Sequence, residues 1–479
     1  MATNRLSRRC LLRSAIAASG ATALTVALGA CGQPAAPPTP TAAPAKSTPA
    51  PAPTAKPQAQ ATPTAKPQAQ PTPQAQAKPA SGGTVEITFA AHGDQSWQEF
   101  WNKVVDRFNK SQSKIKVTFQ SEPTNTWQKY LTLMAGGTMY DTFRNEEKRL
   151  PEFVHRGKQL LDITSYAQAD KDVNKEDFPP TVWDEFFWEG KMYGFGHDLS
   201  PAVIFINRKI FKDKGVPLPP TKWGDPKWDW NAFLETAKKL TYGEGAQKVF
   251  GVAGNTWWVY MHPWIWSNGG AVVLPDNKTV VLDSPEAVEA WEFYAALILQ
   301  HKVMPIAAQA TEGPDQLFES NRAAMDINNT SYTIRMRQMK DFDWDMAPFP
   351  TAKTGKVFDR VPNNVVSGYA KTKYPEESWQ FLKFMGSKDA TADARGMPAR
   401  YSVANSDDFL KRTPNQNWQL LVDSGPIRKS EVLSPYFGEF DNTLRAAWES
   451  VQGGNKTVKQ MVQEMKPKLT DILAGKTSQ

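Results

Sequence analysis

Residues 84–120 decide the fold class, because they encode a strand, a helix and a second strand in immediate succession. The run TVEITFA at 84–90 is rich in β-branched and aromatic residues. The run WQEFWNKVVDRFNKS at 97–111 repeats apolar residues at helical spacing, and KVTFQ at 116–120 again favours a strand. A helix between two strands is typical of layered α/β proteins with parallel sheets.

The same alternation continues along the chain. Further strand-like runs lie at 192–195, 202–207, 249–252, 323–327, 344–349 and 365–370. Helical patterns separate them at 127–136, 230–240, 284–301, 375–386 and 457–473. Asp283-Ser284-Pro285-Glu286 supplies an N-cap followed by proline at the first helical position. The sequence therefore predicts an α/β fold with mainly parallel sheets.

The part of the chain from Thr84 onward is too long for one core, and it is nearly neutral. Its 396 residues exceed the size of about 250 to 300 residues at which single cores stop growing, so two lobes are expected. The whole chain has a net charge of +7, but its first 83 residues hold eight Lys and Arg and no acid. The remaining 48 basic and 49 acidic residues exclude the basic excess of a nucleic-acid-binding protein.

The first thirty residues have the order of an export signal. Arg5, Arg8, Arg9 and Arg13 precede an uncharged run at 14–30. That run falls at or below the roughly 18 to 20 apolar residues that a membrane-spanning helix needs, so a cleaved signal is expected. Adjacent arginines followed by two leucines resemble a twin-arginine signal, although the general secretion route also accepts a basic start.

The apolar run ends in Leu28-Gly29-Ala30-Cys31, which resembles a bacterial lipobox. Acyl chains on Cys31 would hold the protein on the outer face of the cell membrane. Cys10 is the only other cysteine and lies in the segment that cleavage removes. The mature protein is therefore expected to be extracytoplasmic and lipid-anchored, without a disulfide, a thiolate metal site or a cofactor.

Residues 31–83 form a tether between this anchor and the folded part. They consist almost wholly of Pro, Ala, Thr, Gln, Lys, Ser and Gly, and PTAKPQAQ is written at 53–60 and again at 63–70. Such a composition builds no core. At about 3.1 Å per residue, an extended polyproline-like spacer of this length would reach on the order of 150 Å. A segment that contacts the cell wall would have the same composition.

Nine short stretches across the folded part follow one another in an order that is typical of one protein family. They are GGTMYD at 136–141, KMYGF at 191–195, INRKIF at 206–211, WIWSNGG at 264–270, DSPEAV at 283–288, NRAAM at 321–325, MAPFP at 346–350, SWQFLKF at 378–384 and GMPAR at 396–400. In these stretches the chain resembles the family 1 extracellular solute-binding proteins, which include maltose- and multiple-sugar-binding proteins. Each stretch is weak alone, and their order over nearly four hundred residues is specific.

The resemblance implies a bilobal, type II periplasmic-binding-protein-like fold, with two discontinuous α/β lobes, a hinge and a ligand cleft. Residues 84–198 and 328–374 would form lobe 1, and residues 199–327 and 375–479 would form lobe 2. The chain would cross between lobes near Asp198, Asn328 and Tyr374. A monomer would close around a small ligand, without a cofactor, and deliver it to the permease subunits of an ABC importer.

A sugar site needs flat aromatic rings beside polar groups, because sugars have apolar C–H faces and hydroxyl edges. Trp257 and Trp258 are adjacent and follow a predicted strand, so at least one of them is expected in the cleft. The resemblance adds Asp198 as the foremost polar contact. His92, Asp94, Asn145 and Glu146 stand at loop positions that the family uses. Asn329 and Ser331 stand where the family commonly has Gly and Trp, so the stacking ring there would be missing or supplied by Tyr332. Asn329 and Asn364 add amide groups that suit hydroxyl recognition, and Arg400, Tyr401 and Glu439 are further candidates from the second lobe.

Other functions are less well supported by the sequence. No Gly-x-Ser-x-Gly, P-loop or His-Glu-x-x-His motif is present, and the five histidines are scattered, so an enzyme is not expected. A surface sensor or adhesin would carry the same tether. The ligand is open between a sugar, a polyol, a sugar phosphate and a non-sugar solute.

Overall fold

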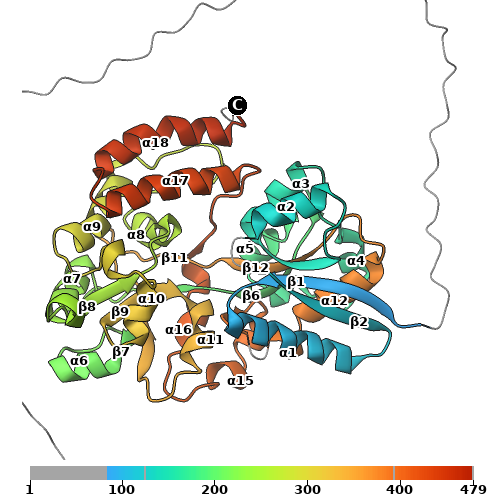
Figure 1. Ribbon diagram of the computed structural model, residues 1–479, viewed down its shortest axis with the longest axis horizontal. Helices are drawn as coiled ribbons and strands as arrows, with labels where there is room; N and C mark the ends of the chain where they lie inside the picture. Colours follow the sequence, from blue (N-terminus) through green and yellow to red (C-terminus); the bar gives the residue numbers. More distant parts are fainter. Residues whose placement is uncertain (1–82, 123–125, 392–393, 477–479) are drawn as a thin grey trace, which may run out of the picture. The chain divides into compact units, whose positions relative to one another are not determined.

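The computed structural model describes residues 83–122, 126–391 and 394–476. The export signal, Cys31 and nearly all of the tether lie outside these ranges, so what was expected of them stays a prediction. The described residues form one compact unit, which contains two α/β lobes joined by extended segments (Figure 1). Among the described residues, no helix combines the length and the apolarity needed to cross a membrane.

The first lobe is built on a six-stranded sheet of order β13-β6-β12-β3-β1-β2. The strands are β1 Val85–His92, β2 Ile115–Glu122, β3 Thr142–Glu146, β6 Phe195–Leu199, β12 Asn363–Gly368 and β13 Met397–Pro398. β1 and β2 run parallel, in register from Val85 and Ile115 onward, and α1 (Gln95–Ser111) joins them. The predicted strand–helix–strand opening is therefore confirmed.

The second lobe is built on a four-stranded sheet of order β10-β7-β9-β8. Its strands are β7 Ala202–Asn207, β8 Phe250–Gly254, β9 Ala323–Asn329 and β10 Trp344–Ala347. The remaining strands form two short pairs, β4 Phe187–Trp188 with β5 Lys191–Met192 and β11 Asp359–Arg360 with β14 Arg428–Lys429.

The prediction of mainly parallel sheets is wrong. In the first sheet, β12 pairs antiparallel with β3 and β6, and β13 pairs antiparallel with β6. In the second sheet, β7 pairs antiparallel with β9 and β10, while β8 and β9 are parallel. None of these antiparallel pairs joins strands that follow one another directly along the chain, so a local strand–helix–strand pattern could not set their direction.

Helices cover both sheets. The longer ones are α2 Trp127–Ala135, α7 Trp230–Lys239, α9 Pro285–Leu299, α12 Pro375–Met385, α17 Phe437–Gln452 and α18 Val458–Leu473. The shorter ones are α3 Leu150–His155, α4 Thr164–Ala169, α5 Pro180–Asp184, α6 Arg208–Lys214, α8 His262–Ser267, α10 Pro314–Glu319, α11 Thr333–Met336, α13 Lys388–Thr391, α14 Tyr401–Ala404, α15 Asp407–Leu410 and α16 Gln419–Val422. α9 begins as expected, with the Ser284 hydroxyl accepting from the Ala287 N–H.

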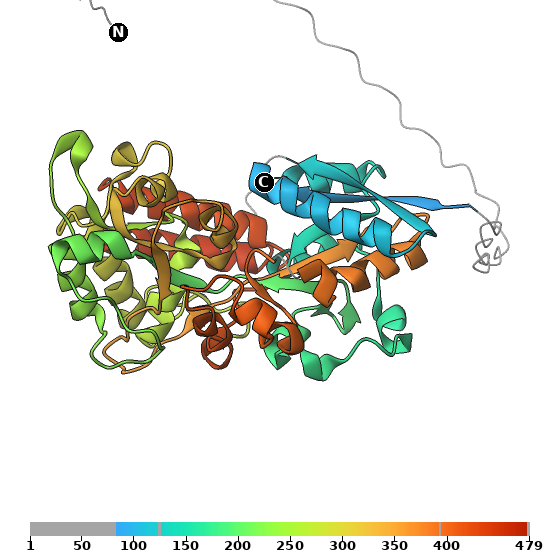
Figure 2. The ribbon, with the colours of Figure 1, turned by 90° about the horizontal axis from the view of Figure 1, so that it is seen from below.

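Two predicted lobe boundaries are corrected by the structure. The chain does not return to the first lobe at Asn328, because β9 runs on to Asn329 and β10 still pairs with β7. α12 does not belong to the second lobe, since it packs on β12, β6 and β1. Figure 2 shows this orange helix beside the blue strands of the first lobe. A helical pattern reveals an apolar face but not the sheet that this face will cover.

Candidate functional site

A cavity of about 780 Å³, called the cleft below, lies between the two lobes. The first lobe lines it with the ends of β1 and β3 and the first turns of α1 and α2, and the second lobe with residues after β8 and β9 and one face of α17. The connecting segments add Ser200, Arg360 and Pro362. Such a concave, partly aromatic site between two lobes has the form of a small-molecule binding site.

Two tryptophans form the aromatic wall of the first lobe. Trp97 stands in the first turn of α1, whose N-cap Asp94 accepts from two backbone N–H groups at 3.0 and 3.2 Å. Trp127 is the first residue of α2. The Arg144 guanidinium lies 5.3 Å from the Trp97 ring, and that of Arg149 lies 5.4 Å from the Trp127 ring. These cation–π contacts hold both half-buried rings in place.

Arg144 organises the polar groups between these rings. Its guanidinium lies 2.9 Å from His92 Nε2 and donates to Asn364 Oδ1 at 2.5 Å and to Glu146 at 3.1 Å. Burial, reinforced by the charge of Arg144, lowers the pKa of His92 to about 3. His92 is therefore neutral near pH 7, and its Nε2 accepts from the arginine.

The second lobe faces this wall with Trp257, which lies just before a short 3₁₀ helix at Trp258–Met261. The Trp257 indole N–H donates to Asp441 Oδ1 of α17 at 2.5 Å. Three cations approach its ring: Arg445 at 4.6 Å, Lys148 at 5.1 Å and Arg360 at 5.5 Å. The ring is thus held by contacts from both lobes and from a connecting strand.

A chain of buried charges runs along the base of the cleft. Lys148 Nζ lies 3.4 Å from the Glu146 carboxylate and 3.0 Å from that of Glu431, which also pairs with Arg360. Arg360 in turn donates to Asn329 at 2.8 Å. Burial acts to raise the pKa of Glu431, but the charges of Arg360 and Lys148 outweigh it and hold the pKa at about 2. These ion pairs connect the first lobe to the segment that follows β14.

Two carboxyl groups lie close together on the second-lobe side. The Asn328 amide donates to Asp315 at 2.9 Å and to Asp326 at 3.2 Å, and Asp315 lines the cleft. Burial raises the pKa of Asp315 to about 6, against the partial compensation of Arg335. Burial, and then the neighbouring Asp315, raise the pKa of Asp326 well above its usual range. The pair therefore retains protons at pH values where isolated carboxyls are ionised.

Replacing Asp315 by asparagine should stabilise the protein at neutral pH. The folded protein holds the Asp315 proton up to about pH 6, while the unfolded chain releases it near 3.8, so the wild type loses stability as the pH rises between these values. Asp315→Asn should gain about 1 to 3 kcal/mol over the wild type at pH 7.5 and nearly nothing at pH 4. Urea unfolding at both pH values measures the difference, and an equal effect at both would contradict this assignment.

Six of the predicted site residues line the cleft: His92, Asp94, Glu146, Trp257, Asn329 and Asn364. Asn145 does not, although it is next to Glu146. Successive side chains of a strand point to opposite faces, so Arg144 and Glu146 face the cleft while the Asn145 amide donates to Ser367 of β12.

Other predicted contacts are occupied elsewhere. Asp198 is fully buried and pairs with Arg395 at 3.3 Å, so its carboxylate belongs to the first-lobe core. Tyr332 is buried, and its hydroxyl donates to Glu319 at 2.6 Å. It therefore does not supply the stacking ring that Asn329 and Ser331 leave open.

Arg400, Tyr401 and Glu439 also lie off the cleft. The Arg400 guanidinium donates to the Gly386 carbonyl and pairs with Asp177. Tyr401 begins α14 and does not line the cleft, with 40% of its surface exposed. Glu439 is on α17, but a different face of this helix lines the cleft. That face consists of Gly438, Asp441, Asn442 and Arg445, at the spacing i, i+3, i+4 and i+7.

Several cleft residues were not predicted. They include Trp97, Trp127, Arg144, Lys148, Arg149, Tyr260, Asp315, Arg360, Asp441 and Arg445. The sequence did contain a signal for two of them. Trp97 and Trp127 both begin predicted helices that follow a predicted strand, and such strand–helix junctions cluster at one edge of an α/β sheet. Nothing in the local sequence distinguishes Lys148 or Arg360 from surface cations.

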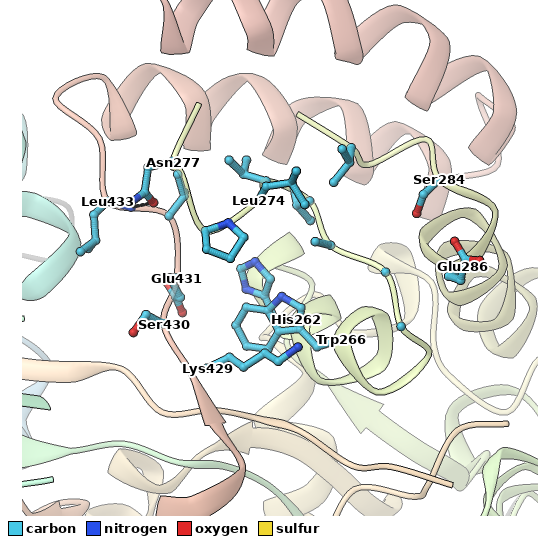
Figure 3. A pocket seen from close by; sticks show the side chains of 18 of the residues that line it. His262, Trp266, Leu274, Asn277, Ser284, Glu286, Lys429, Ser430, Glu431 and Leu433 are labelled. Atoms are coloured by element: carbon cyan, nitrogen blue, oxygen red, sulfur yellow. Dashed lines mark hydrogen bonds between the residues drawn. The ribbon is translucent and has the colours of Figure 1, made fainter. Parts of the chain in front are cut away.

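A second cavity of about 760 Å³ lies within the second lobe (Figure 3). It is lined by residues of the segments 258–286 and 429–433. His262 and Trp266 stack there, with ring centroids 4.3 Å apart and planes inclined by 15°. Trp258, predicted for the ligand cleft, lines this second cavity instead. Since the first-lobe sheet contributes nothing to it, lobe closure would not enclose a ligand there.

One protein family matches most of the folded part of the chain. The family described as bacterial extracellular solute-binding protein matches residues 94–392, which is more than half of the chain. A putative binding protein of Brucella abortus (strain 2308) is 26% identical over 388 residues, covering 79% of this chain and 90% of that protein.

Solved structures share the fold. An ABC substrate-binding protein from Listeria monocytogenes in complex with cycloalternan superposes with a TM-score of 0.74 at 23% identity, over 82% of this chain and 99% of that one. The GacH receptor of Streptomyces glaucescens, described unliganded and with acarbose, gives 0.72 at 18% identity, over 82% and 100%. With the two-lobed fold and the matched residues together, the chain belongs to the bacterial extracellular solute-binding protein family.

Proposed function

We propose that this protein captures an uncharged carbohydrate in the cleft and delivers it to an ABC importer. The observation that carries the proposal is the pairing of aromatic rings across the cleft, with Trp97 and Trp127 on one lobe and Trp257 on the other. Aromatic rings offer flat apolar surfaces that match the C–H faces of sugar rings. Asn255, Asn329 and other polar side chains between them are suited to hydroxyl groups.

The charges of the cleft favour a neutral ligand over a phosphate or a carboxylate. Each cation that lines the cleft has a carboxylate partner: Arg144 with Glu146, Lys148 with Glu146 and Glu431, Arg149 with Glu152, Arg360 with Glu431, and Arg445 with Asp441. An anionic ligand would have to displace one of these carboxylates or lie beside it, and breaking a buried pair is costly. This favours a sugar or polyol over a sugar phosphate.

The N-terminal sequence completes the proposal. A lipid on Cys31 would anchor the mature chain, and the tether at 32–83 would let the lobes search for ligand and reach the permease. The proteins of similar fold that are solved with cycloalternan and acarbose support a carbohydrate as the ligand class. Delivery to permease subunits is the usual task of a tethered binding protein with this fold.

Thermal unfolding against a solute panel tests the ligand class. The panel contains cycloalternan, acarbose, maltotriose and tagatose, with a polyol and a hexose phosphate as comparisons. At 100 times its dissociation constant, a true ligand adds about 2.7 kcal/mol of stability and raises the midpoint. We expect a shift with an uncharged sugar and none with the phosphate. The assignment would be overturned if only the hexose phosphate raised the midpoint, or if no carbohydrate of the panel raised it.

A further inference from the structure

Asp441 receives three hydrogen bonds on one buried carboxylate. Its Oδ1 accepts from the indole N–H of Trp257 at 2.5 Å and from that of Trp258 at 2.8 Å. Its Oδ2 accepts from the Arg445 guanidinium, one turn further along α17, at 3.1 Å. Asp441 is only 2% exposed, so water does not substitute for these donors.

The two tryptophans that share this oxygen are adjacent in sequence but face different cavities. Trp257 lines the cleft, whereas Trp258 is fully buried and lines the second cavity. Because both indole N–H groups converge on Asp441 Oδ1, the carboxylate sets the position of each ring relative to α17. Lys148 and Arg360 also contact the Trp257 ring, and neither is on α17. They keep these cation–π contacts only if the ring stays in the position that Asp441 sets.

We propose that Asp441 is a positioning residue for ligand recognition, which holds the Trp257 indole in the orientation that stacks on the sugar. The inference rests on the proposed function, because it assigns Trp257 as the ring that the ligand covers. Asp441 need not touch the ligand to do this. Its carboxylate is consumed by the two indoles and by Arg445.

This geometry requires a carboxylate at position 441, and a side-chain amide cannot replace it. Both oxygens of Asp441 are acceptors, one for the two indole N–H groups and one for Arg445. In Asp441→Asn, one of these places must be taken by an NH₂ group, which would face a donor in either orientation of the amide. The substitution changes almost no volume, so its effect isolates the hydrogen bonds.

A second variant should relieve that conflict. Arg445→Gln replaces a group that only donates by an amide, whose oxygen can also accept. In the double variant, Asp441→Asn with Arg445→Gln, the new asparagine oxygen can keep both indoles while its NH₂ faces the glutamine oxygen or solvent. The effect of Asp441→Asn should therefore be much smaller in the Arg445→Gln background than in the wild type.

The experiment measures two quantities on the folded part of the chain, Thr84 to Gln479. The first is the affinity for the panel sugar that stabilises the wild type. The second is the pair of ¹⁹F resonances of Trp257 and Trp258 in 5-fluorotryptophan-labelled protein, assigned with Trp257→Phe and Trp258→Phe. Glu439→Gln serves as the control, because Glu439 is on the same helix and does not line the cleft.

We expect Asp441→Asn to weaken sugar binding by about 10- to 100-fold and to move both resonances, with both effects largely lost in the Arg445→Gln background. Glu439→Gln should leave affinity and resonances unchanged. Should Asp441→Asn not fold, a folded double variant whose resonances match those of Arg445→Gln would support the proposal. Unchanged Trp257 resonance and affinity in Asp441→Asn would overturn it. If no sugar binds the wild type, the proposed function fails, and the resonances still decide whether Asp441 positions the ring.

Discussion

Trp257→Ala is expected to weaken carbohydrate binding by about 30-fold or more. The half-buried ring faces the cleft from the second lobe, opposite Trp97 and Trp127. Truncating a central tryptophan of a binding site typically costs about 2 kcal/mol or more, which corresponds to about 30-fold in affinity. Isothermal titration calorimetry with the sugar that stabilises the wild type measures the loss.

The matched control is Trp188→Ala. Trp188 is also half-buried, but it lies on β4 of the first lobe and does not line the cleft. Its removal should lower the unfolding midpoint and leave the dissociation constant within about twofold of the wild type. Equal affinities for Trp257→Ala and the wild type would show that the ligand does not stack on this ring.

Glu431→Gln is expected to destabilise the protein by about 3 to 5 kcal/mol. Glu431 is buried between Lys148 and Arg360, and both partners are buried as well. Removing one member of a buried ion pair leaves uncompensated charge in a medium of low polarity, and such changes cost about this much. Urea unfolding at pH 7.5 measures the loss through the transition midpoint.

An exposed pair provides the comparison. Asp407 and Lys411 are one turn apart on the surface at 2.9 Å, with 78% and 73% of their side chains exposed. Asp407→Asn should change the free energy of unfolding by less than about 0.5 kcal/mol. A loss of similar size for both variants would mean that Glu431 contributes no more than a surface carboxylate does.

The functional class was predictable from the sequence. The order of short stretches from 136–141 to 396–400 pointed to a solute-binding family, and the family match over residues 94–392 confirms it. The family consists of extracellular binding proteins, so the predictions of a non-enzyme acting outside the cytoplasm are confirmed as well. Lipidation of Cys31 and the twin-arginine route remain predictions, as these residues lie outside those described.

The site was predictable only in part. Residues at or just after a strand end, such as His92, Asp94 and Trp257, do line the cleft, because strand ends in α/β folds gather at one edge. Asp198 also follows this pattern, yet it is buried against Arg395, a residue 197 positions further along the chain. A partner at that distance leaves no trace in the local sequence.

The sequence by itself determined most of the longer helices and strands and the two-lobed class, because these depend on hydrophobic periodicity, turn chemistry and chain length. Only the tertiary structure decided which sheet α12 covers, where β10 pairs and which of two adjacent tryptophans faces the cleft. It also decided that Lys148, Glu431 and Arg360 meet at the base of the cleft. These outcomes depend on contacts between residues far apart in the chain, and local pattern carries no information about such partners.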